Sequence, residues 1–121
     1  MVADGFASPE DVRVLWIVAV DQGATRTLVF GGEWDLAQSD AANDAFGQAL
    51  ARDPECLVLD LSRVRFIDAP AVHELLDAHQ RCARNGTRMR IVPGPRSVQR
   101  VFELCGVIDT LPFAVEDANA H

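Results

Sequence analysis

The stretch CLVLDLSRVRFIDAPAVHEL (residues 56–75) joins an apolar run to a helical pattern through a short connection. Its first six residues are nearly all apolar, which is typical of a strand covered on both faces. The helix that follows begins near Asp68, whose carboxylate can accept a hydrogen bond from a free N–H group of the first turn. No hydroxyl follows, because the next residues are Ala69, Pro70 and Ala71. The stretch therefore predicts a central strand that leads into a helix.

The residues before this stretch predict a hairpin and a helix. Two β-branched runs, residues 12–20 and 26–30, are separated by the turn sequence Asp-Gln-Gly-Ala. Such a pair of runs predicts two antiparallel strands. Residues 41–50 then carry apolar side chains at helical spacing, which predicts a helix that packs on one face.

The residues after it repeat a helix–strand pattern. The second helix ends at Asn85-Gly86, where glycine tolerates the left-handed conformation of a C-cap, and a strand follows at 87–92. A third helix contains residues 98–105 and stops at Gly106, and a last strand lies near 110–115. A hairpin followed by alternating helices and strands predicts an α/β fold with a mixed sheet.

Length and composition limit the classes of protein to which the chain can belong. With 121 residues, of which 49% are hydrophobic and 24% charged, it is long enough for one domain with its own core. We expect this domain to span residues 12–115, between flexible ends at 1–11 and 116–121. The net charge of −7 argues against nucleic acid as a partner.

The charges are unevenly distributed along the chain. Eight of the eleven arginines lie within residues 61–102, which contain only three acidic residues, so this stretch is net positive. A charge asymmetry can orient a partner during association. Solvated helix faces produce the same pattern, and that simpler interpretation is the one we prefer for the sequence alone.

The cysteines and the hydropathy pattern indicate a cellular compartment. Cys56, Cys82 and Cys105 are odd in number and form no C-x-x-C pair, so we expect reduced thiols in the core. No signal-peptide pattern opens the chain, and the longest apolar run, residues 14–20, is too short to span a bilayer. These features predict a cytoplasmic protein that does not insert into membranes.

Residues that could carry out catalysis are few. His73 and His79 are six positions apart on one predicted helix and therefore point away from each other. We expect His73 to be exposed beside Asp77, and His79 to be partly buried. No nucleophile-elbow, phosphate-loop or dinucleotide-binding motif occurs in the sequence. The sequence thus predicts no enzyme, no metal site and no cofactor.

Four segments, taken in order, resemble the motifs of one known family. They are GGEWD (31–35), LVLDLSRVRFIDAPA (57–71), ARNGTRMRIV (83–92) and VQRVFELCGVIDTLPF (98–113). In this order they resemble STAS domains, the family of bacterial anti-sigma-factor antagonists, over nearly the whole chain. The resemblance implies a small α/β domain that regulates transcription by binding a protein, without catalysis.

The resemblance also implies a partner and a switch. Antagonists of this family bind an anti-sigma kinase, an ATP-binding partner that phosphorylates the Ser directly after the motif Asp. Only the unmodified antagonist binds that partner tightly and so frees the sigma factor. Here Asp68 is kept, but Ala69 stands at the position of that Ser, so no phosphorylation site is predicted there. The residues that we predict to bind the partner are Glu33, Asp35, Asp68, Ala69, Pro70, Ala71 and Val72.

Two interpretations of the Asp68 turn stay open. In the first, the domain keeps the docking shape without the covalent switch and binds an anti-sigma kinase constitutively. In the second, the turn is only a well-formed helix start in a STAS scaffold that serves another partner, such as a sensory complex or a membrane transporter of which the chain is a subunit. The sequence does not decide whether the domain forms a homodimer.

Two further residues near the turn have a structural interpretation beside the functional one. Asp35 is either a partner contact or a cap of the helix at 41–50 or of its lead-in turn, and we favour the cap. Ser62 is the nearest remaining hydroxyl to the Asp68 turn. We interpret it as a turn residue after the strand, in preference to a substitute phosphorylation site.

Overall fold

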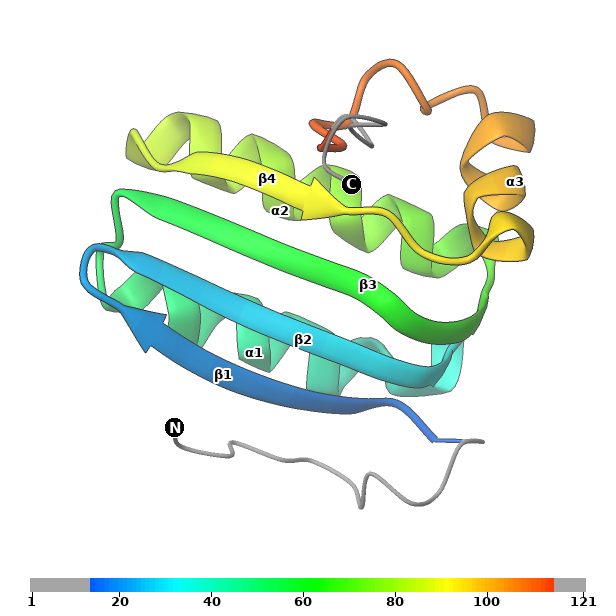
Figure 1. Ribbon diagram of the computed structural model, residues 1–121, viewed down its shortest axis with the longest axis horizontal. Helices are drawn as coiled ribbons and strands as arrows, with labels where there is room; N and C mark the ends of the chain where they lie inside the picture. Colours follow the sequence, from blue (N-terminus) through cyan, green and yellow to red (C-terminus); the bar gives the residue numbers. More distant parts are fainter. Residues whose placement is uncertain (1–13, 115–121) are drawn as a thin grey trace, which may run out of the picture.

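The computed structural model describes residues 14–114, and these form a four-stranded sheet with three α-helices (Figure 1). In chain order the elements are β1 (Trp16–Gln22), β2 (Thr25–Trp34), the 3-10 helix η1 (Leu36–Gln38), α1 (Ser39–Ala51), β3 (Cys56–Ile67), α2 (Ala69–Asn85), β4 (Arg88–Val92) and α3 (Arg96–Leu104). The predicted flexible ends, residues 1–11 and 116–121, lie outside the described residues. So do the first two residues of the predicted strand at 12–20.

The sheet has the strand order β1-β2-β3-β4. The first two strands pair antiparallel, which confirms the predicted hairpin, whereas β2 with β3 and β3 with β4 pair parallel. Parallel neighbours need a crossover, and the helices α1 and α2 supply these crossovers. The predicted α/β class with a mixed sheet is therefore confirmed.

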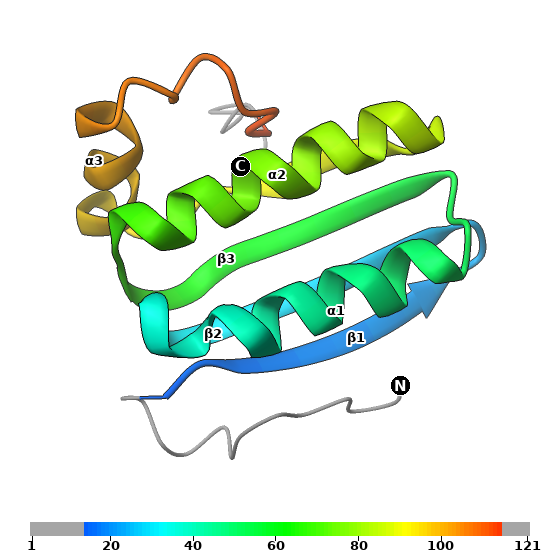
Figure 2. The same cartoon turned by 180° about the vertical axis from the view of Figure 1, so that it is seen from behind.

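The helices are unevenly placed around the sheet. Both α1 and α2 cover the same face, as the two opposite views show, while α3 lies beside one end of the sheet (Figures 1 and 2). Within residues 14–114, no helix covers the other face of the sheet (Figure 1). Along β1, Ile17 and Ala19 are buried and the alternate residues are only half-buried, as expected for a strand with one face in the core.

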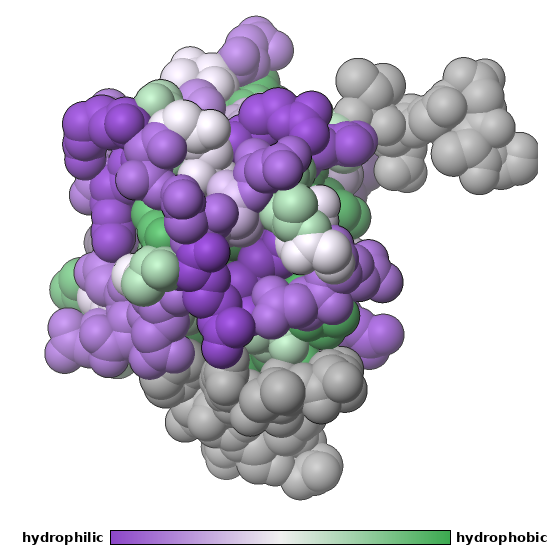
Figure 3. All heavy atoms as spheres, turned by 90° about the vertical axis from the view of Figure 1, so that its left-hand side faces the viewer, coloured by the Kyte–Doolittle hydropathy of each residue, from purple (hydrophilic) through white to green (hydrophobic). Residues whose placement is uncertain are grey.

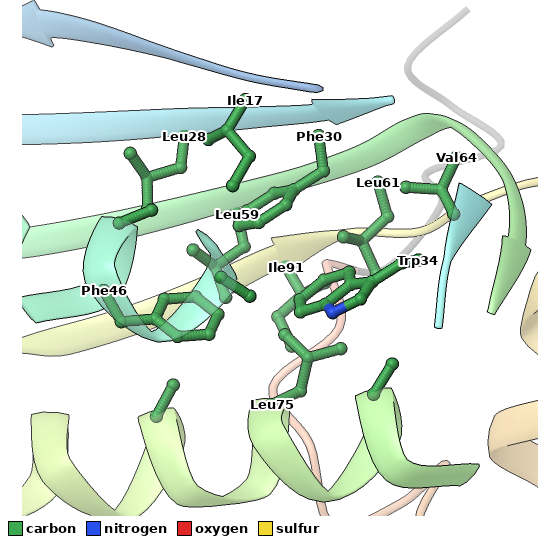
Figure 4. Close-up of a cluster of buried hydrophobic side chains, with 14 of the residues drawn as sticks. Ile17, Leu28, Phe30, Trp34, Phe46, Leu59, Leu61, Val64, Leu75 and Ile91 are labelled. Atoms are coloured by element: carbon green, nitrogen blue, oxygen red, sulfur yellow. The ribbon is translucent and has the colours of Figure 1, made fainter. Parts of the chain in front are cut away.

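Aromatic side chains from β2 and α1 fill the core beneath the helices (Figure 4). The rings of Phe30 and Trp34 stack with 4.7 Å between their centroids and 3° between their planes. Phe46 of α1 lies against both rings, and Leu75 of α2 is fully buried in the same cluster. Aromatic pairs of this kind add about 0.5–1.5 kcal/mol to what their buried area contributes.

The two central strands are longer than the sequence predicts. Strand β2 continues past Phe30 to Trp34, and β3 continues past Leu61 to Ile67. The register between them shifts twice in this added part, and at each shift β3 contributes one residue more than β2. These bulges change the burial pattern, since Leu61, Val64 and Ile67 are buried at every third position instead of every second.

The predicted last strand near residues 110–115 is wrong for the part that the structure describes. Residues up to 114 contain only an isolated parallel bridge between Phe113 and Ile91. Its two hydrogen bonds run from Ile91 N to Pro112 O and from Ala114 N to Ile91 O, at 3.0 and 2.7 Å. Pro112 lacks an N–H group, and the side chain of Leu111 turns into the core, so pairing does not extend backwards.

The predicted helix ends are confirmed. Helix α2 ends at Gly86, which has φ 76° and donates its N–H to the carbonyl groups of the last turn. Helix α3 is followed by Gly106 with φ 75°. Both glycines adopt the left-handed conformation, which is strained for residues with a Cβ atom.

The cysteines only partly follow the prediction of core thiols. All three are free, and Cys56 and Cys82 are buried as expected. Burial raises the pKa of the Cys82 thiol, because the thiolate would lose its hydration. Cys105 is exposed, so the prediction is wrong for this residue. It follows directly after α3 ends, where the apolar stripe of that helix no longer faces the core.

Candidate functional site

Asp68 ties together two junctions at one end of the sheet. It is the N-cap of α2, and its Oδ1 accepts a 3.0 Å hydrogen bond from the backbone N–H of Ala71. Its Oδ2 accepts a second bond, of 3.1 Å, from the backbone N–H of Leu36 at the start of η1. One carboxylate therefore caps the helix after β3 and also holds the loop after β2.

Asp35 caps the short helix η1. Its Oδ1 accepts a 3.0 Å bond from the N–H of Ala37, and its carbonyl oxygen accepts a 2.9 Å bond from the N–H of Gln38. The favoured interpretation of Asp35 as the cap of a lead-in turn is thus confirmed. Glu33 precedes it on β2, is half-buried and pairs with Phe66 of β3 in the sheet register.

The first turn of α2 presents fewer side chains than predicted. Ala69 is exposed and Pro70 is half-buried, so both can face a partner. Ala71 and Val72 are 0% and 1% exposed, because they belong to the stripe with which α2 packs on the sheet. The prediction that these two residues contact a partner is therefore corrected, because their side chains belong to the core.

Two large apolar side chains at these junctions are exposed and were missed from the sequence. Leu36 is 65% and Phe66 is 47% exposed, and among the described residues only Leu104 is a third large apolar side chain with such exposure. We use the name junction surface for the set Glu33, Asp35, Leu36, Phe66, Asp68, Ala69 and Pro70. Single exposed apolar residues are ordinary, but two beside one capping carboxylate mark a surface suited to a protein partner.

A buried carboxylate lies beneath the junction surface. Glu74 of α2 is only 8% exposed. Its Oε1 accepts a 3.0 Å bond from the indole Nε1 of Trp34, and its Oε2 accepts a bond from the hydroxyl of Ser39. The last residue of β2 and the first residue of α1 are thereby fixed to α2. Sequence reasoning missed this arrangement, although the acidic residue within the apolar stripe of α2 was a signal for it.

Three other predicted positions are located as follows. His73 is exposed and His79 is half-buried, as expected, and neither belongs to the junction surface. Ser62 is exposed, but it lies within β3 and not in a turn after it, because the strand continues through the bulges. Its backbone N–H donates a 2.9 Å bond to the carboxylate of Asp60.

The described residues contain neither a metal-ligating cluster nor a membrane-spanning helix. Across residues 14–114, His, Cys, Asp and Glu side chains nowhere gather in a group of three or more that could hold a metal ion. The helices in that part of the chain are also too short or too polar to cross a bilayer.

The fold, the motif order and the junctions together define a class of protein. The STAS domain family model matches residues 17–119, and the chain belongs to that family. This match covers all four strands except the first residue of β1, and all three α-helices.

Several similar proteins within this class are named as anti-sigma factor antagonists. The chain is 36% identical over 83 residues to the anti-sigma-F factor antagonist RsfA of Mycobacterium tuberculosis, a match that covers 67% of this chain and 65% of that relative. It thus spans slightly less than two thirds of the relative's length. A crystal structure of an anti-sigma factor antagonist from Mycobacterium paratuberculosis superimposes with a TM-score of 0.77, 22% identity and 95% coverage of both chains.

A third similar structure is that of the anti-sigma factor antagonist SpoIIAA in its unphosphorylated form. It matches with a TM-score of 0.67 and 17% identity, over 88% of this chain and 93% of the other. The same Bacillus protein is also known in a phosphorylated form. At such low identity these structural likenesses show a shared fold, and the family and its motifs rest on the sequence matches.

Proposed function

We propose that this STAS domain binds an anti-sigma factor through its junction surface and acts as an antagonist without a phosphorylation switch. The observation that carries the proposal is the Asp68 carboxylate, which joins the loop after β2 to the first turn of α2. The name of the 36% identical relative supports an anti-sigma factor as the partner. The role is regulatory binding, with no chemical step.

The chemistry of the surface fits a partner with an apolar patch near a basic group. Leu36 and Phe66 offer apolar area that a partner can bury, at about 25 cal/mol per Å² removed from water. Asp35 uses only one carboxylate oxygen within the described structure, so the other can accept a hydrogen bond from a cation of the partner. Apolar anchors ringed by polar groups are typical of binding hot spots.

With Ala69 and Pro70 in the first turn of α2, phosphorylation there cannot release a bound partner. A phosphoryl group would add a charge of about −1.5 to −2 at this exposed position, and a docked partner would be expelled by that charge. Ala69 has no oxygen to accept such a group. Pro70 also lacks an N–H group, which leaves the helix start with less capacity to hold an anion. We infer that binding is constitutive and that the partner is an ATP-binding anti-sigma kinase.

The test is calorimetric titration of the full chain with the anti-sigma-F factor of Mycobacterium tuberculosis, with and without ATP. The wild-type chain should bind equally well in both conditions. The double substitution Leu36→Ser with Phe66→Ser should weaken binding about 30-fold, the effect of losing hot-spot contacts worth about 2 kcal/mol. Absence of binding by the wild-type chain would refute the proposed function.

Leu104→Ser is the matched control for this experiment. Leu104 is 74% exposed, like the two anchors, but it ends α3 and lies outside the junction surface. Its substitution removes the same kind of apolar side chain and should leave the affinity unchanged. Equal weakening by Leu104→Ser and by the double substitution would show that the effect is not specific to the junction surface.

The missing switch has a separate readout. After incubation with the anti-sigma-F factor and ATP, intact-mass measurement should find no added phosphate on the wild-type chain. Ala69→Ser combined with Pro70→Ser should restore an acceptor hydroxyl. The mass of this variant should then rise by about 80 Da for each phosphate added. A stoichiometric phosphate on wild-type Ser62 would contradict the constitutive form of the proposal.

The alternative role as a subunit of a sensory complex or of a membrane transporter stays a prediction. No contact or surface in the described residues favours it over the antagonist role. The cytoplasmic location inferred from the sequence likewise stays a prediction.

A further inference from the structure

Two adjoining hollows lie next to the loop between β4 and α3. The larger, of about 570 Å³, is lined by Ser62, Val92, Pro93, Gly94, Pro95 and Gln99. The smaller, of about 370 Å³, is lined by Trp16, Gly32, Ser62, Arg63, Val64, Arg65 and Pro95. Because they share Ser62 and Pro95, we treat them as one site and name it the arginine hollow. Its size is within the range of small-ligand pockets.

The indole of Trp16 forms a flat wall of the arginine hollow. Trp16 pairs with Gly31 across the hairpin, and Gly31 pairs with Arg63 on the next strand, so the three residues form one row across the sheet. A Cβ atom on Gly31 would lie 2.1 Å from the Trp16 ring. The ring therefore lies over this glycine, and it offers a planar surface in a hollow that Arg63 and Arg65 also line.

The charge of the arginine hollow is unbalanced. Arg63 and Arg65 both line it, and no Asp or Glu does. Neither arginine forms an ion pair with any residue in the described range 14–114. Within residues 14–114 only Arg26 and Arg52 form ion pairs, so an arginine without one is common here, but Arg63 and Arg65 also line the same hollow.

A third hollow, of about 240 Å³, shows the contrasting arrangement. It is lined by Arg26 and Arg52 together with Asp21 and Asp53. There, Asp21 lies 2.7 Å from Arg26 and 3.6 Å from Arg52, so its cations are neutralised within the protein. The arginine hollow lacks such acids, and its two cations are left for an external anion.

We propose that the arginine hollow binds a small organic anion that carries a planar group. Its carboxylate or phosphate group lies between Arg63 and Arg65, because guanidinium groups bind both anions with paired hydrogen bonds. Its planar group lies against the indole of Trp16. The Ser62 hydroxyl is available as a further hydrogen-bond partner. The arginine hollow shares no lining residue with the junction surface, and its proposal does not rest on the proposed function.

The test is a titration of the ¹⁵N-labelled full chain with phenyl phosphate as the probe. Binding is measured from the NMR chemical shifts of the backbone amide and indole N–H groups. Phenyl phosphate should bind saturably, with shifts concentrated at the Trp16 indole and residues 62–65. Inorganic phosphate lacks the ring and phenol lacks the charge, so each should bind at least ten-fold more weakly. Equal binding of phenyl phosphate and inorganic phosphate would overturn the role of Trp16.

A pair of charge-matched variants decides whether the arginines carry the site. Arg63→Gln with Arg65→Gln should weaken phenyl phosphate binding at least ten-fold. Arg88→Gln with Arg90→Gln removes the same charge from exposed positions of β4 that line neither hollow, and should have little effect. Equal losses in both pairs, or no saturable shift in the wild-type chain, would overturn the proposal. Saturable binding of hexaglutamate but not of phenyl phosphate would also overturn it, in favour of an acidic peptide.

Discussion

The two ends of the sheet differ in what their exposed side chains are free to do. The end with the β1–β2 turn presents mainly hydrophilic residues (Figure 3), and its Asp21 is already paired with Arg26 and Arg52. The opposite end carries the junction surface, where Leu36 and Phe66 are exposed. At the first end Asp21 is satisfied within the protein, whereas the second end leaves apolar and acidic groups for a partner.

The connections at the two ends are also held in different ways. At the β1–β2 end, a 2.9 Å backbone bond from Glu55 N to Ala24 O joins the β1–β2 turn to the connection between α1 and β3. This bond does not depend on the side chain of either residue. At the junction end, a 3.3 Å backbone bond from Asp68 N to Trp34 O is joined by additional links from the side chains of Asp68 and Glu74. Single substitutions should therefore disturb the junction end more than the other end. The predictions below test this difference.

The largest effect is expected for Trp34→Ala. Trp34 is fully buried, stacks on Phe30 and donates to Glu74, so its loss leaves a cavity and an unpartnered buried oxygen. The free energy of unfolding should fall by about 3–5 kcal/mol, measured by urea denaturation. Binding of the anti-sigma factor should also weaken, because the loop that carries Asp35 loses its support.

Leu57→Ala is the comparison for Trp34→Ala. Leu57 is equally buried but lies near the start of β3, close to the opposite end. Its substitution should cost about 2–5 kcal/mol in stability and leave the affinity of the folded chain unchanged. If Leu57→Ala weakened binding as much as Trp34→Ala, the two ends would not be functionally distinct.

A smaller effect is expected for Asp68→Ala. The substitution removes an N-cap, which lowers stability by about 1 kcal/mol, and it also removes the bond to Leu36 N. Partner binding should fall about ten-fold, because the loop after β2 loses its side-chain bond to the start of α2 and keeps only the backbone bond from residue 68 N to Trp34 O. Asp35 caps only η1, so the substitution Asp35→Ala should lower the stability by less. Thermal unfolding and calorimetric titration of both variants measure the difference, and equal stability losses would contradict the bridging role of Asp68.

The fold could be predicted from the sequence because its signals are local. The hairpin, the three helices and the C-cap at Gly86 follow from periodicity and from glycine conformations. The extra length of β3 could not be predicted in this way. Its bulges shift Leu61, Val64 and Ile67 to a spacing of three, and a spacing of three matches neither the period of a strand nor that of a helix.

The site was predictable only in part, for a different reason. Asp35 and Asp68 were found because a cap is recognised from its position before a helix. The bond from Leu36 to Asp68 joins residues 32 positions apart, and that from Trp34 to Glu74 joins residues 40 positions apart. Such contacts depend on how the strands lie beside each other, which no local pattern contains. Ala71 and Val72 were assigned to the surface for another reason, because the family resemblance alone placed them beside the position of the family's Ser.

The smallest effect is expected at the opposite end, for Asp21→Asn. The hydrogen bond from Arg26, with the charges of Arg26 and Arg52, lowers the pKa of Asp21 below its ordinary value. A lowered pKa means that the charged carboxylate stabilises the fold above about pH 4, and that this stabilisation is lost as the pH falls through the lowered pKa. The variant should therefore be slightly less stable than the wild-type chain at pH 7 and equally stable in strong acid. Urea denaturation across this pH range measures the difference.

Asp53→Asn is the matched control at the same end. Asp53 lines the same hollow, forms no ion pair within residues 14–114 and has φ 52°, a conformation that Asn also tolerates. Its substitution changes the net charge equally but removes no ion pair within the described residues, so the stability at pH 7 should stay close to that of the wild-type chain. Neither variant should alter binding of the anti-sigma factor, because both sites lie at the β1–β2 turn end of the sheet, opposite the junction surface. A loss of affinity in Asp21→Asn alone would extend the functional surface to this end and break the contrast between the two.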